Sequence, residues 1–178
     1  GTAISGTVNI ADITYEQALT YDFGIYKGNE YAGTKIPTYE AFLSLCRNIS
    51  LVPVIELKAG TREQVNALYD LAAKYGLKNK AIWLSQTFTY LAYIRDYSDA
   101  TLVYCRSTYT ADTQYLKNDG NKVIVGLPSA GITAETVLAC IAAGYEIWQY
   151  TIETASDISE NQYVTGYLTN TIDVGEAL

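Results

Sequence analysis

The chain has 178 residues, of which 49% are hydrophobic and 17% are charged, and its formal net charge is −7. This composition is typical of an ordered domain with one sizeable core. The acidic balance argues against a nucleic-acid partner, because a phosphate backbone calls for a basic face. No apolar run approaches the roughly 20 residues needed to span a bilayer, so we expect that a membrane is not required.

Two residue types narrow the chemistry further. Histidine is absent, which removes the commonest general base and the commonest transition-metal ligand from this chain. The three cysteines, Cys46, Cys105 and Cys140, are widely spaced in apolar contexts and form no CxxC pair. They are therefore predicted to be buried thiols rather than zinc ligands or disulfide partners.

The first stretch, residues 1–36, has no clean hydrophobic period and is rich in glycine and aromatic residues between Asp22 and Gly33. It is predicted to be a long loop with one helical turn near Thr14–Leu19. The chain starts without methionine in a loop-like composition, and we expect it to be an internal part of a longer polypeptide. In a β/α barrel, long loops of this kind lie over the carboxyl ends of the strands, where ligands bind.

From residue 37 onward, short apolar segments alternate with amphipathic ones. The predicted strands are Leu51–Lys58, Ala81–Ser85, Thr101–Cys105, Val123–Leu127, Tyr145–Thr151 and Val164–Thr169. The predicted helices are Tyr39–Asn48 after Pro37-Thr38, Arg62–Tyr75 between a Thr61/Gln64 capping box and Gly76, Thr89–Tyr97, Ala111–Leu116, Ala134–Ala143 before Gly144, and Asp157–Gln162. The helix ends follow the usual capping chemistry.

Strands that alternate with helices predict parallel βαβ units. The strands begin at intervals of roughly 20–30 residues, close to the pitch of a (β/α)₈ barrel, where about 250 residues serve eight units. A doubly wound sheet is the alternative, but no Gly-x-Gly-x-x-Gly motif follows the first strand. The sequence therefore predicts an α/β fold of the (β/α)₈ TIM-barrel type, with six of the eight βα units and without the first two strands.

The segment Leu51–Lys58 carries the strongest chemical signal. Because side chains alternate along a strand, Glu56 and Lys58 should project to one side, whereas Ile55 and Leu57 face the other way. Desolvating two ionisable groups costs several kcal/mol unless each group has a partner. A metal for the carboxylate and a phosphate for the ammonium would satisfy both, and an internal salt bridge between the two is the alternative.

Five motifs occur in a distinctive order along the chain. They are Tyr31-Ala32-Gly33, Ile36-Pro37-Thr38, Val54-Ile55-Glu56-Leu57-Lys58, Ile147-Trp148-Gln149-Tyr150-Thr151, and Val164-Thr165-Gly166-Tyr167-Leu168-Thr169-Asn170. This set resembles the glycerophosphodiester phosphodiesterase family over essentially the whole chain. The resemblance implies a phosphodiesterase-like barrel in which residues 1–36 are an insertion region and residues 37–178 are βα units 3–8 of a single domain.

The resemblance also implies metal-dependent hydrolysis of glycerophosphodiesters to glycerol phosphate and an alcohol, in lipid and glycerol metabolism, with calcium or magnesium as cofactor. By the same resemblance, Glu56 is the metal ligand, Lys58 binds phosphate, and Trp148 lines the pocket, with a core position as the alternative for Trp148. The family's His-Arg, Glu-x-Asp and His-Asp pairs are absent, so both catalytic histidines are expected upstream. The chain alone is then expected to be inactive and to bind the cation weakly or not at all.

Other candidate residues carry weaker patterns. Ser85 and Phe88 resemble a Ser-Phe step of the family, although two residues intervene here, and Asn170 stands where the family usually has aspartate, a position predicted to be structural. Ser129 has no histidine to activate it and is not predicted to be a nucleophile. Arg106 follows a strand and could reach an anion, with a solvated loop arginine as the alternative.

Three functional hypotheses remain open at this point. They are the hydrolase of a small-molecule phosphodiester, a non-catalytic phosphodiesterase-like module that binds a phosphorylated headgroup or a protein partner, and a sphingomyelinase-D-like lipase. Six strands without the first two would leave two unpaired edges, so we expect self-association or pairing with the missing N-terminal segment. The compartment is not fixed by the sequence, although much tyrosine and threonine with little lysine and arginine favours a bacterial extracytoplasmic or cell-surface protein.

Overall fold

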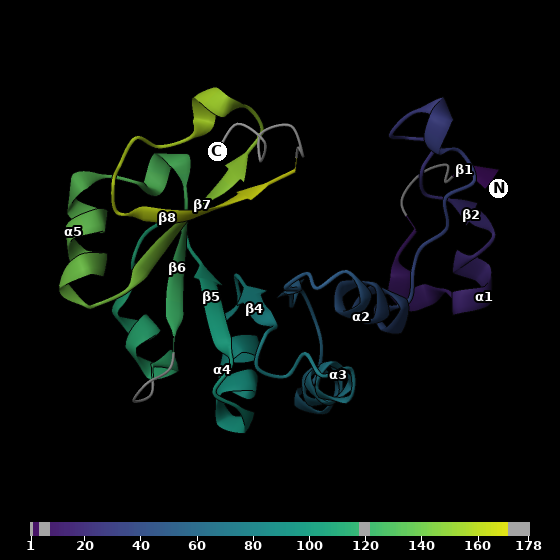
Figure 1. Cartoon of the computed structure of the whole chain (residues 1–178), viewed down its shortest axis with the longest axis horizontal. Coiled ribbons are helices and arrows are strands. Elements are labelled where there is room, and N and C mark those ends of the chain that lie inside the picture. The colour runs from purple at the N-terminus through teal and green to yellow at the C-terminus, as the bar shows by residue number, and fades with distance from the viewer. Residues whose placement is uncertain (1, 4–7, 118–121, 171–178) are drawn as a thin grey trace. The chain divides into compact units, whose positions relative to one another are not determined.

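The computed structural model of the chain describes residues 2–3, 8–117 and 122–170 (Figure 1). The chain forms two compact units, Gly1–Leu45 and Cys46–Leu178. Their boundary lies within helix α2 (Tyr39–Asn48), whereas the predicted division at residue 36 concerns an insertion region and stays a prediction. Of the helices in residues 2–3, 8–117 and 122–170, none combines the length and the hydropathy of a membrane-spanning segment.

The first unit is organised around a buried aspartate. Its strands are β1 (Thr2–Ala3) and β2 (Tyr21–Asp22), which pair in parallel. The helical turn predicted near Thr14–Leu19 is confirmed as α1 (Tyr15–Ala18). The Asp22 carboxylate accepts hydrogen bonds from the backbone N–H groups of Gly33, Ile25 and Gly24 at 2.6, 3.2 and 3.1 Å. These bonds, the one from Gly33 most of all, lower the pKa of Asp22 and close the loop that follows β2.

The second unit contains a sheet of six parallel strands that follow one another in chain order. The strands are β3 (Val54–Glu56), β4 (Ile82–Ser85), β5 (Thr101–Cys105), β6 (Val123–Pro128), β7 (Glu146–Ile152) and β8 (Val164–Thr169). The sheet curls from β3 to β8, and α4 and α5 lie on its outer side (Figure 1). All six predicted strands are present, and the predicted fold class, an incomplete (β/α)₈ barrel, is confirmed.

The helices of this unit follow the predicted caps. They are α3 (Arg62–Lys74), α4 (Phe88–Tyr97) and α5 (Ala134–Ala142), and α2 ends within the unit. At the start of α3, the Gln64 N–H donates to Thr61 Oγ1 at 3.3 Å and the Thr61 N–H donates to Gln64 Oε1 at 2.9 Å. Gly76 follows α3 with a φ of 74°, the left-handed conformation in which glycine ends a helix at little cost.

Two predicted helices differ in the structure. Ala111–Leu116 is a 3₁₀ helix, and the predicted helix Asp157–Gln162 is wrong, because only a 3₁₀ turn, Ala155–Asp157, forms in this region. The Asp157 carboxylate accepts hydrogen bonds from the backbone N–H groups of Glu153 and Thr154 at 3.0 and 2.8 Å. These bonds hold a closed turn and lower the pKa of Asp157, and Ile158, which follows the turn, is extended rather than helical.

Strand β3 is shorter than the predicted Leu51–Lys58. It begins directly after Pro53, whose nitrogen has no hydrogen to donate to a neighbouring strand. At its other end, the Leu57 N–H still donates to the Leu84 carbonyl at 2.7 Å. Lys58 therefore stands just beyond the strand, on a backbone that the sheet still holds.

Alternate residues of the strands divide between two faces of the sheet. On the outer face, Trp83 of β4 packs against Tyr69 of α3, with ring centroids 5.8 Å apart. Tyr104 of β5 packs against Phe88 of α4 at 6.1 Å. The inner face carries its own apolar cluster, which comprises Leu84, Val103, Cys105 and Ile124, with Ile82, Trp148, Tyr150 and Leu168 packed against it. The concave side of the sheet thus carries a packed apolar surface.

Candidate functional site

A cavity of about 390 Å³ lies at the carboxyl end of the strands, on the concave side of the sheet. We call it the mouth cavity. It is lined by Val54, Glu56, Lys58, Leu84, Gln86, Cys105, Tyr150, Thr151, Leu168, Thr169 and Asn170. Ligands of β/α barrels bind at this end, because the loops that carry functional side chains follow the strands there. The mouth cavity is therefore the candidate active site.

Glu56 and Lys58 stand together on the rim of the mouth cavity. Lys58 Nζ lies 3.3 Å from Glu56 Oε2, and the two side chains are 79% and 40% exposed, respectively. Ile55 and Leu57 point the other way and are buried. The predicted alternation is confirmed, and an exposed ion pair of this kind adds little stability of its own. Both groups are available to a ligand that enters the cavity.

Ser85 fixes the backbone beside this pair. Its hydroxyl donates to the Leu57 carbonyl at 2.6 Å, and the Thr87 N–H donates to Ser85 Oγ at 3.0 Å. Ser85 is fully buried, so these bonds are shielded from solvent. They connect the end of β3 to the start of the loop that follows β4. In the sequence, Ser85 stood out only as part of a Ser-Phe step. The feature that could have indicated its positioning contact is a serine at the end of an apolar strand that neighbours the strand of Glu56.

Trp148 and Tyr150 occupy successive inward positions of β7. The Trp148 indole packs over Gly166, where an added Cβ would lie 2.5 Å from Nε1, and it belongs to the apolar cluster of the inner face. Tyr150 lies one layer nearer the carboxyl end and lines the mouth cavity, and burial raises its pKa. Contact between Trp148 and a ligand stays a prediction, whereas Tyr150 is a lining residue that the motif comparison missed.

The mouth cavity offers few ligands for a divalent cation. Among the described residues that line it, Glu56 is the one carboxylate, and the amides of Gln86 and Asn170 add neutral oxygens. Among residues 2–3, 8–117 and 122–170, no group of three or more histidine, cysteine, aspartate or glutamate side chains could hold a metal ion. Calcium takes six to eight oxygens, and magnesium takes six. The described residues therefore do not make a complete cation site.

Cys105 lies at the floor of the mouth cavity, close to Glu56. Burial, and to a smaller extent the Glu56 carboxylate, raises the pKa of its thiol from 9.0 to about 12. Cys46, Cys105 and Cys140 are all free and buried, as predicted from the sequence. A thiol with so high a pKa stays protonated at neutral pH and is a poor nucleophile.

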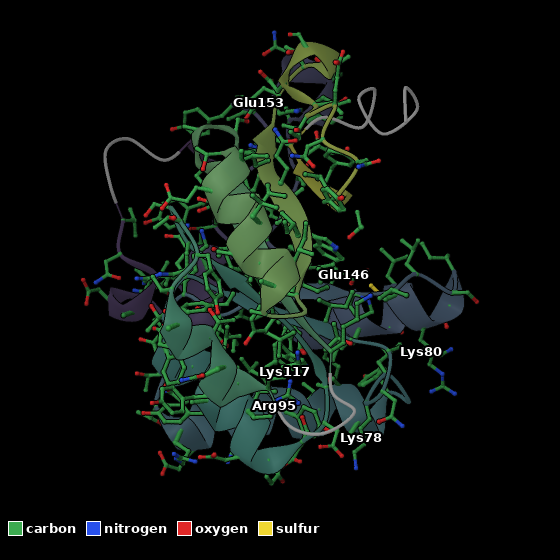
Figure 2. The ribbon with its side chains drawn as sticks, turned by 90° about the vertical axis from the view of Figure 1, so that its left-hand side faces the viewer. Lys78, Lys80, Arg95, Lys117, Glu146 and Glu153 are labelled. Carbon is green, nitrogen blue, oxygen red and sulfur yellow. The ribbon has the colours of Figure 1, made fainter. Side chains whose placement is uncertain are left out.

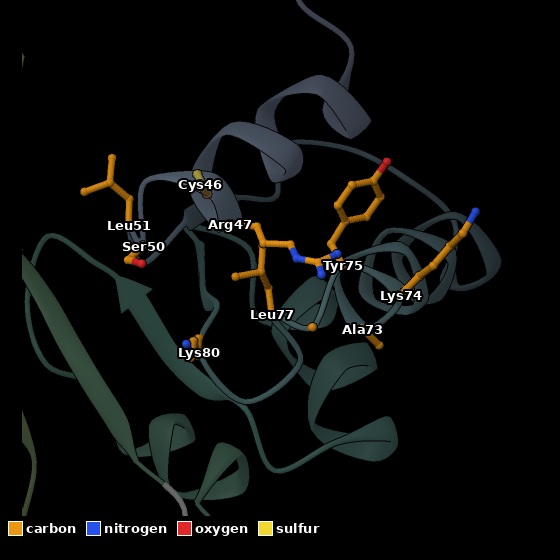
Figure 3. A pocket seen from close by; sticks show the side chains of 10 residues that line it. Cys46, Arg47, Ser50, Leu51, Ala73, Lys74, Tyr75, Leu77 and Lys80 are labelled. Carbon is orange, nitrogen blue, oxygen red and sulfur yellow. The ribbon is translucent and has the colours of Figure 1, made fainter.

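A second cavity, of about 340 Å³, lies at the opposite end of the strands (Figure 3). It is lined by Cys46, Arg47, Ser50, Leu51, Ala73, Lys74, Tyr75, Gly76, Leu77 and Lys80. Figure 3 shows Arg47 extending from α2 toward Tyr75, whereas Lys74 points away. Arg47 and Lys74 stand in the last turns of their helices, where cations offset the negative end of the helix dipole. The interaction with the helix dipoles therefore explains why Arg47 and Lys74 stand beside this second cavity.

Two glutamates mark the two ends of β7, Glu146 as its first residue and Glu153 directly after its last. Glu146 and Glu153 stand at opposite ends of the strand (Figure 2). Glu146 forms an ion pair with Lys122 at the amino end, and Glu153 accepts a hydrogen bond from Asn170 Nδ2 at 2.9 Å at the carboxyl end. The Asn170 side chain is thus tied to the rim of the mouth cavity, and Ser129 likewise has a structural partner in Gln149 Nε2 at 2.9 Å.

Comparison with known proteins defines the class of this fold. No family model matches the sequence, and no curated protein sequence matches it significantly. Solved structures of glycerophosphodiester phosphodiesterases do match it along nearly the whole chain. The chain therefore has the fold of these barrels, as the sequence motifs led us to expect.

Three of these structures illustrate the likeness. A phosphodiesterase from Oleispira antarctica, in complex with its product sn-glycerol-3-phosphate, is 17% identical with a TM-score of 0.77, over 97% of this chain and 73% of the other. A glycerophosphodiester phosphodiesterase from Agrobacterium tumefaciens gives 18% and 0.70, over 95% and 73%. One from Parabacteroides distasonis gives 14% and 0.71, over 92% and 70%. At these identities the likeness shows the fold alone.

Proposed function

We propose that this chain is the larger part of a glycerophosphodiester phosphodiesterase-type hydrolase and that the phosphodiester binds in the mouth cavity. The observation that supports the proposal most directly is the position of Glu56 and Lys58, 3.3 Å apart on its rim. A structure of the same fold, from Oleispira antarctica, binds sn-glycerol-3-phosphate. The proposed products are glycerol phosphate and an alcohol.

Lys58 has the clearest part in this reaction. In the hydrolysis, a water oxygen bonds to phosphorus, one ester P–O bond breaks, and the leaving oxygen takes a proton to become the alcohol. Negative charge accumulates on the remaining phosphoryl oxygens, and the Lys58 ammonium donates a hydrogen bond to one of them. Ser85 acts as a positioning residue, because its bond to the Leu57 carbonyl fixes the backbone from which Lys58 extends.

The proton transfers need an acid and a base beside the phosphodiester. A positioned acid and base contribute about 10²–10⁴ in rate, and the sequence has no histidine. Burial raises the pKa of Tyr150 and of Cys105, so neither side chain replaces a histidine at neutral pH. We therefore expect no turnover by the chain alone, and we propose that a further segment carrying two histidines supplies both groups.

We also propose Glu56 as one ligand of a calcium or magnesium ion. Such an ion would neutralise phosphoryl charge when bound. Because Glu56 is the one carboxylate among the described residues that line the mouth cavity, the chain alone is expected to bind the ion weakly or not at all.

Binding of a simple phosphodiester tests the proposal without turnover. Glycerophosphoethanolamine is titrated into the chain and followed by amide chemical shifts or calorimetry. We expect Lys58→Met to weaken binding about tenfold, the usual value of one charge-assisted hydrogen bond. Lys78→Met is the matched control, because Lys78 lies exposed in the turn before β4, at the amino end of the sheet. Equal effects of the two variants, or no binding at all, would contradict the proposal.

A second experiment tests the reaction itself. The chain is joined to a segment that carries the His-Arg, Glu-x-Asp and His-Asp pairs, and hydrolysis of glycerophosphocholine or bis-p-nitrophenyl phosphate is measured with and without calcium or magnesium. We expect metal-dependent turnover that Glu56→Gln lowers and that the chain alone lacks. Absence of turnover in the joined protein would count against a hydrolase.

The absence of histidine also favours a second candidate function. A non-catalytic module that binds a phosphorylated headgroup would use Lys58 in the same way but would need no acid or base. Such a module should bind the phosphodiester and fail to hydrolyse it even when joined to the histidine-bearing segment. The two experiments together therefore separate the two functions.

A further inference from the structure

A smaller cavity adjoins the mouth cavity on the side of β5. It measures about 330 Å³ and is lined by Gln86, Cys105, Arg106, Ser107 and Tyr150. Gln86, Cys105 and Tyr150 line the mouth cavity as well, so the two spaces share a wall. A phosphodiester bound beside Glu56 and Lys58 can therefore extend one of its two ester substituents toward Arg106.

The backbone of Arg106 is fixed from two neighbouring strands. Its N–H donates to the Gly126 carbonyl of β6 at 2.9 Å, and its own carbonyl accepts a hydrogen bond from the Tyr150 hydroxyl of β7 at 3.2 Å. The guanidinium carbon lies 5.2 Å from the centre of the Tyr104 ring. Arg106 is partly buried, so its side chain extends from a fixed backbone and its guanidinium lies near an aromatic ring rather than fully in solvent.

The Arg106 guanidinium has no carboxylate partner in the part of the chain that the structure describes. The ion pairs found there join Lys58 to Glu56, Arg62 to Asp96, and Lys122 to Glu146. Gln86 and Ser107, which share the cavity with Arg106, are exposed polar side chains. A guanidinium with free donors, flanked by two more polar groups, matches the planar oxygens of a carboxylate or the oxygens of a phosphate.

We propose that Arg106 forms a second anion subsite, which selects phosphodiesters whose alcohol half carries an anionic group. The inference rests on the proposed function, because it takes the diester phosphate to lie beside Lys58. Arg106 then contacts the carboxylate or phosphate at the far end of the alcohol. An alcohol that carries only an ammonium group gains nothing there and is repelled by the guanidinium.

Two pairs of ligands test the subsite, because the members of each pair differ by one anionic group. Glycerophosphoserine differs from glycerophosphoethanolamine by a carboxylate, and glycerophosphoinositol 4-phosphate differs from glycerophosphoinositol by a phosphate. Dissociation constants are measured for the chain by calorimetry or chemical-shift titration, so that no turnover is needed. We expect the anionic member of at least one pair to bind about tenfold more tightly, as one bidentate charge-assisted contact allows.

Arg106→Gln should remove this preference and leave the affinity for glycerophosphoethanolamine no weaker. Arg62→Gln is the matched control, since Arg62 also lies over a tyrosine ring, that of Tyr93 at 4.4 Å, but belongs to helix α3. A preference confined to one pair identifies the group as carboxylate or phosphate. Equal binding within both pairs, or a preference that persists in Arg106→Gln, overturns the subsite alone, whereas failure of all four ligands to bind overturns the proposed function with it.

Discussion

Glu56 and Lys58 show how much a single strand can reveal about a site. Their spacing of two places both on the rim of the mouth cavity, and buried Ile55 and Leu57 fix which face they take. The alternation of a strand makes this orientation predictable from sequence. Arg106 and Tyr150 are different, because their contact joins residues 44 positions apart and depends on the register of three strands.

The buried thiols provide a test at the residue scale. The pKa of Cys105 is raised from 9.0 to about 12 and that of Cys140 to about 11, chiefly by burial. We expect both thiols of the native protein to resist a disulfide reagent at pH 8, where the unfolded protein should react at all three cysteines. The measurement is the absorbance of the released thiolate in buffer and in guanidinium chloride.

The same two thiols make stability depend on pH in a known direction. Each stays neutral in the native state but ionises near pH 9 once unfolded, so the unfolded state gains from alkaline pH and the native state does not. Their contribution is complete below pH 9 and is lost as the pH rises toward about 12. In the disulfide-reagent experiment, fast modification of native Cys105 at pH 8 would contradict the expected protection and show that the inner face of the sheet opens readily.

At the scale of elements, local signals such as helix caps were sufficient to predict helix and strand boundaries where they agreed with the hydrophobic pattern. The boundaries of α2, β5 and β8 match those predicted, and the capping box of α3 is present. The helix predicted at Asp157–Gln162 does not form, because the Asp157 carboxylate binds backbone N–H groups that precede it. Gln149 holds the same loop, since its side chain contacts the Asp157 carbonyl and the Ser159 N–H, and no local pattern shows this.

The two threonine caps of neighbouring helices form a matched pair for mutation. Thr61 accepts a hydrogen bond from the Gln64 N–H at the start of α3, whereas Thr87, at the start of α4, makes no such capping bond. Thr61→Ala should lower the free energy of unfolding by about 1 kcal/mol. Thr87→Ala should change it by less than about 0.5 kcal/mol. Urea denaturation followed by circular dichroism measures both, and equal losses would show that capping is not the cause.

At the scale of the whole molecule, the sheet has two free edges as far as the described residues show its pairing. Within the described residues, β3 pairs only with β4 and β8 pairs only with β7. The fold class was predictable because repeated βαβ units leave few arrangements for parallel strands. The depth of the mouth cavity was not predictable from the sequence, because it depends on how far the sheet curls between β3 and β8.

Free edges predict association of the chain in solution. An unpaired strand offers its N–H and C=O groups to another chain, and Val54 on β3 is 40% exposed beside them. We expect the average mass in sedimentation or light scattering to rise with concentration and Val54→Lys to reduce this rise. Leu138→Lys is the control, because Leu138 is 64% exposed on helix α5. A chain that remains monomeric at high concentration would contradict this expectation.

The indole that lies over Gly166 gives the molecule a built-in optical probe. The sequence has two tryptophans, and Trp83 is sealed against α3, so a change of emission on adding a ligand or a second polypeptide comes mainly from Trp148. That side chain sits next to the last strand of the sheet, on its hollow side. Anything that fills the hollow, whether a small molecule or a strand from another chain, should alter its fluorescence without any label.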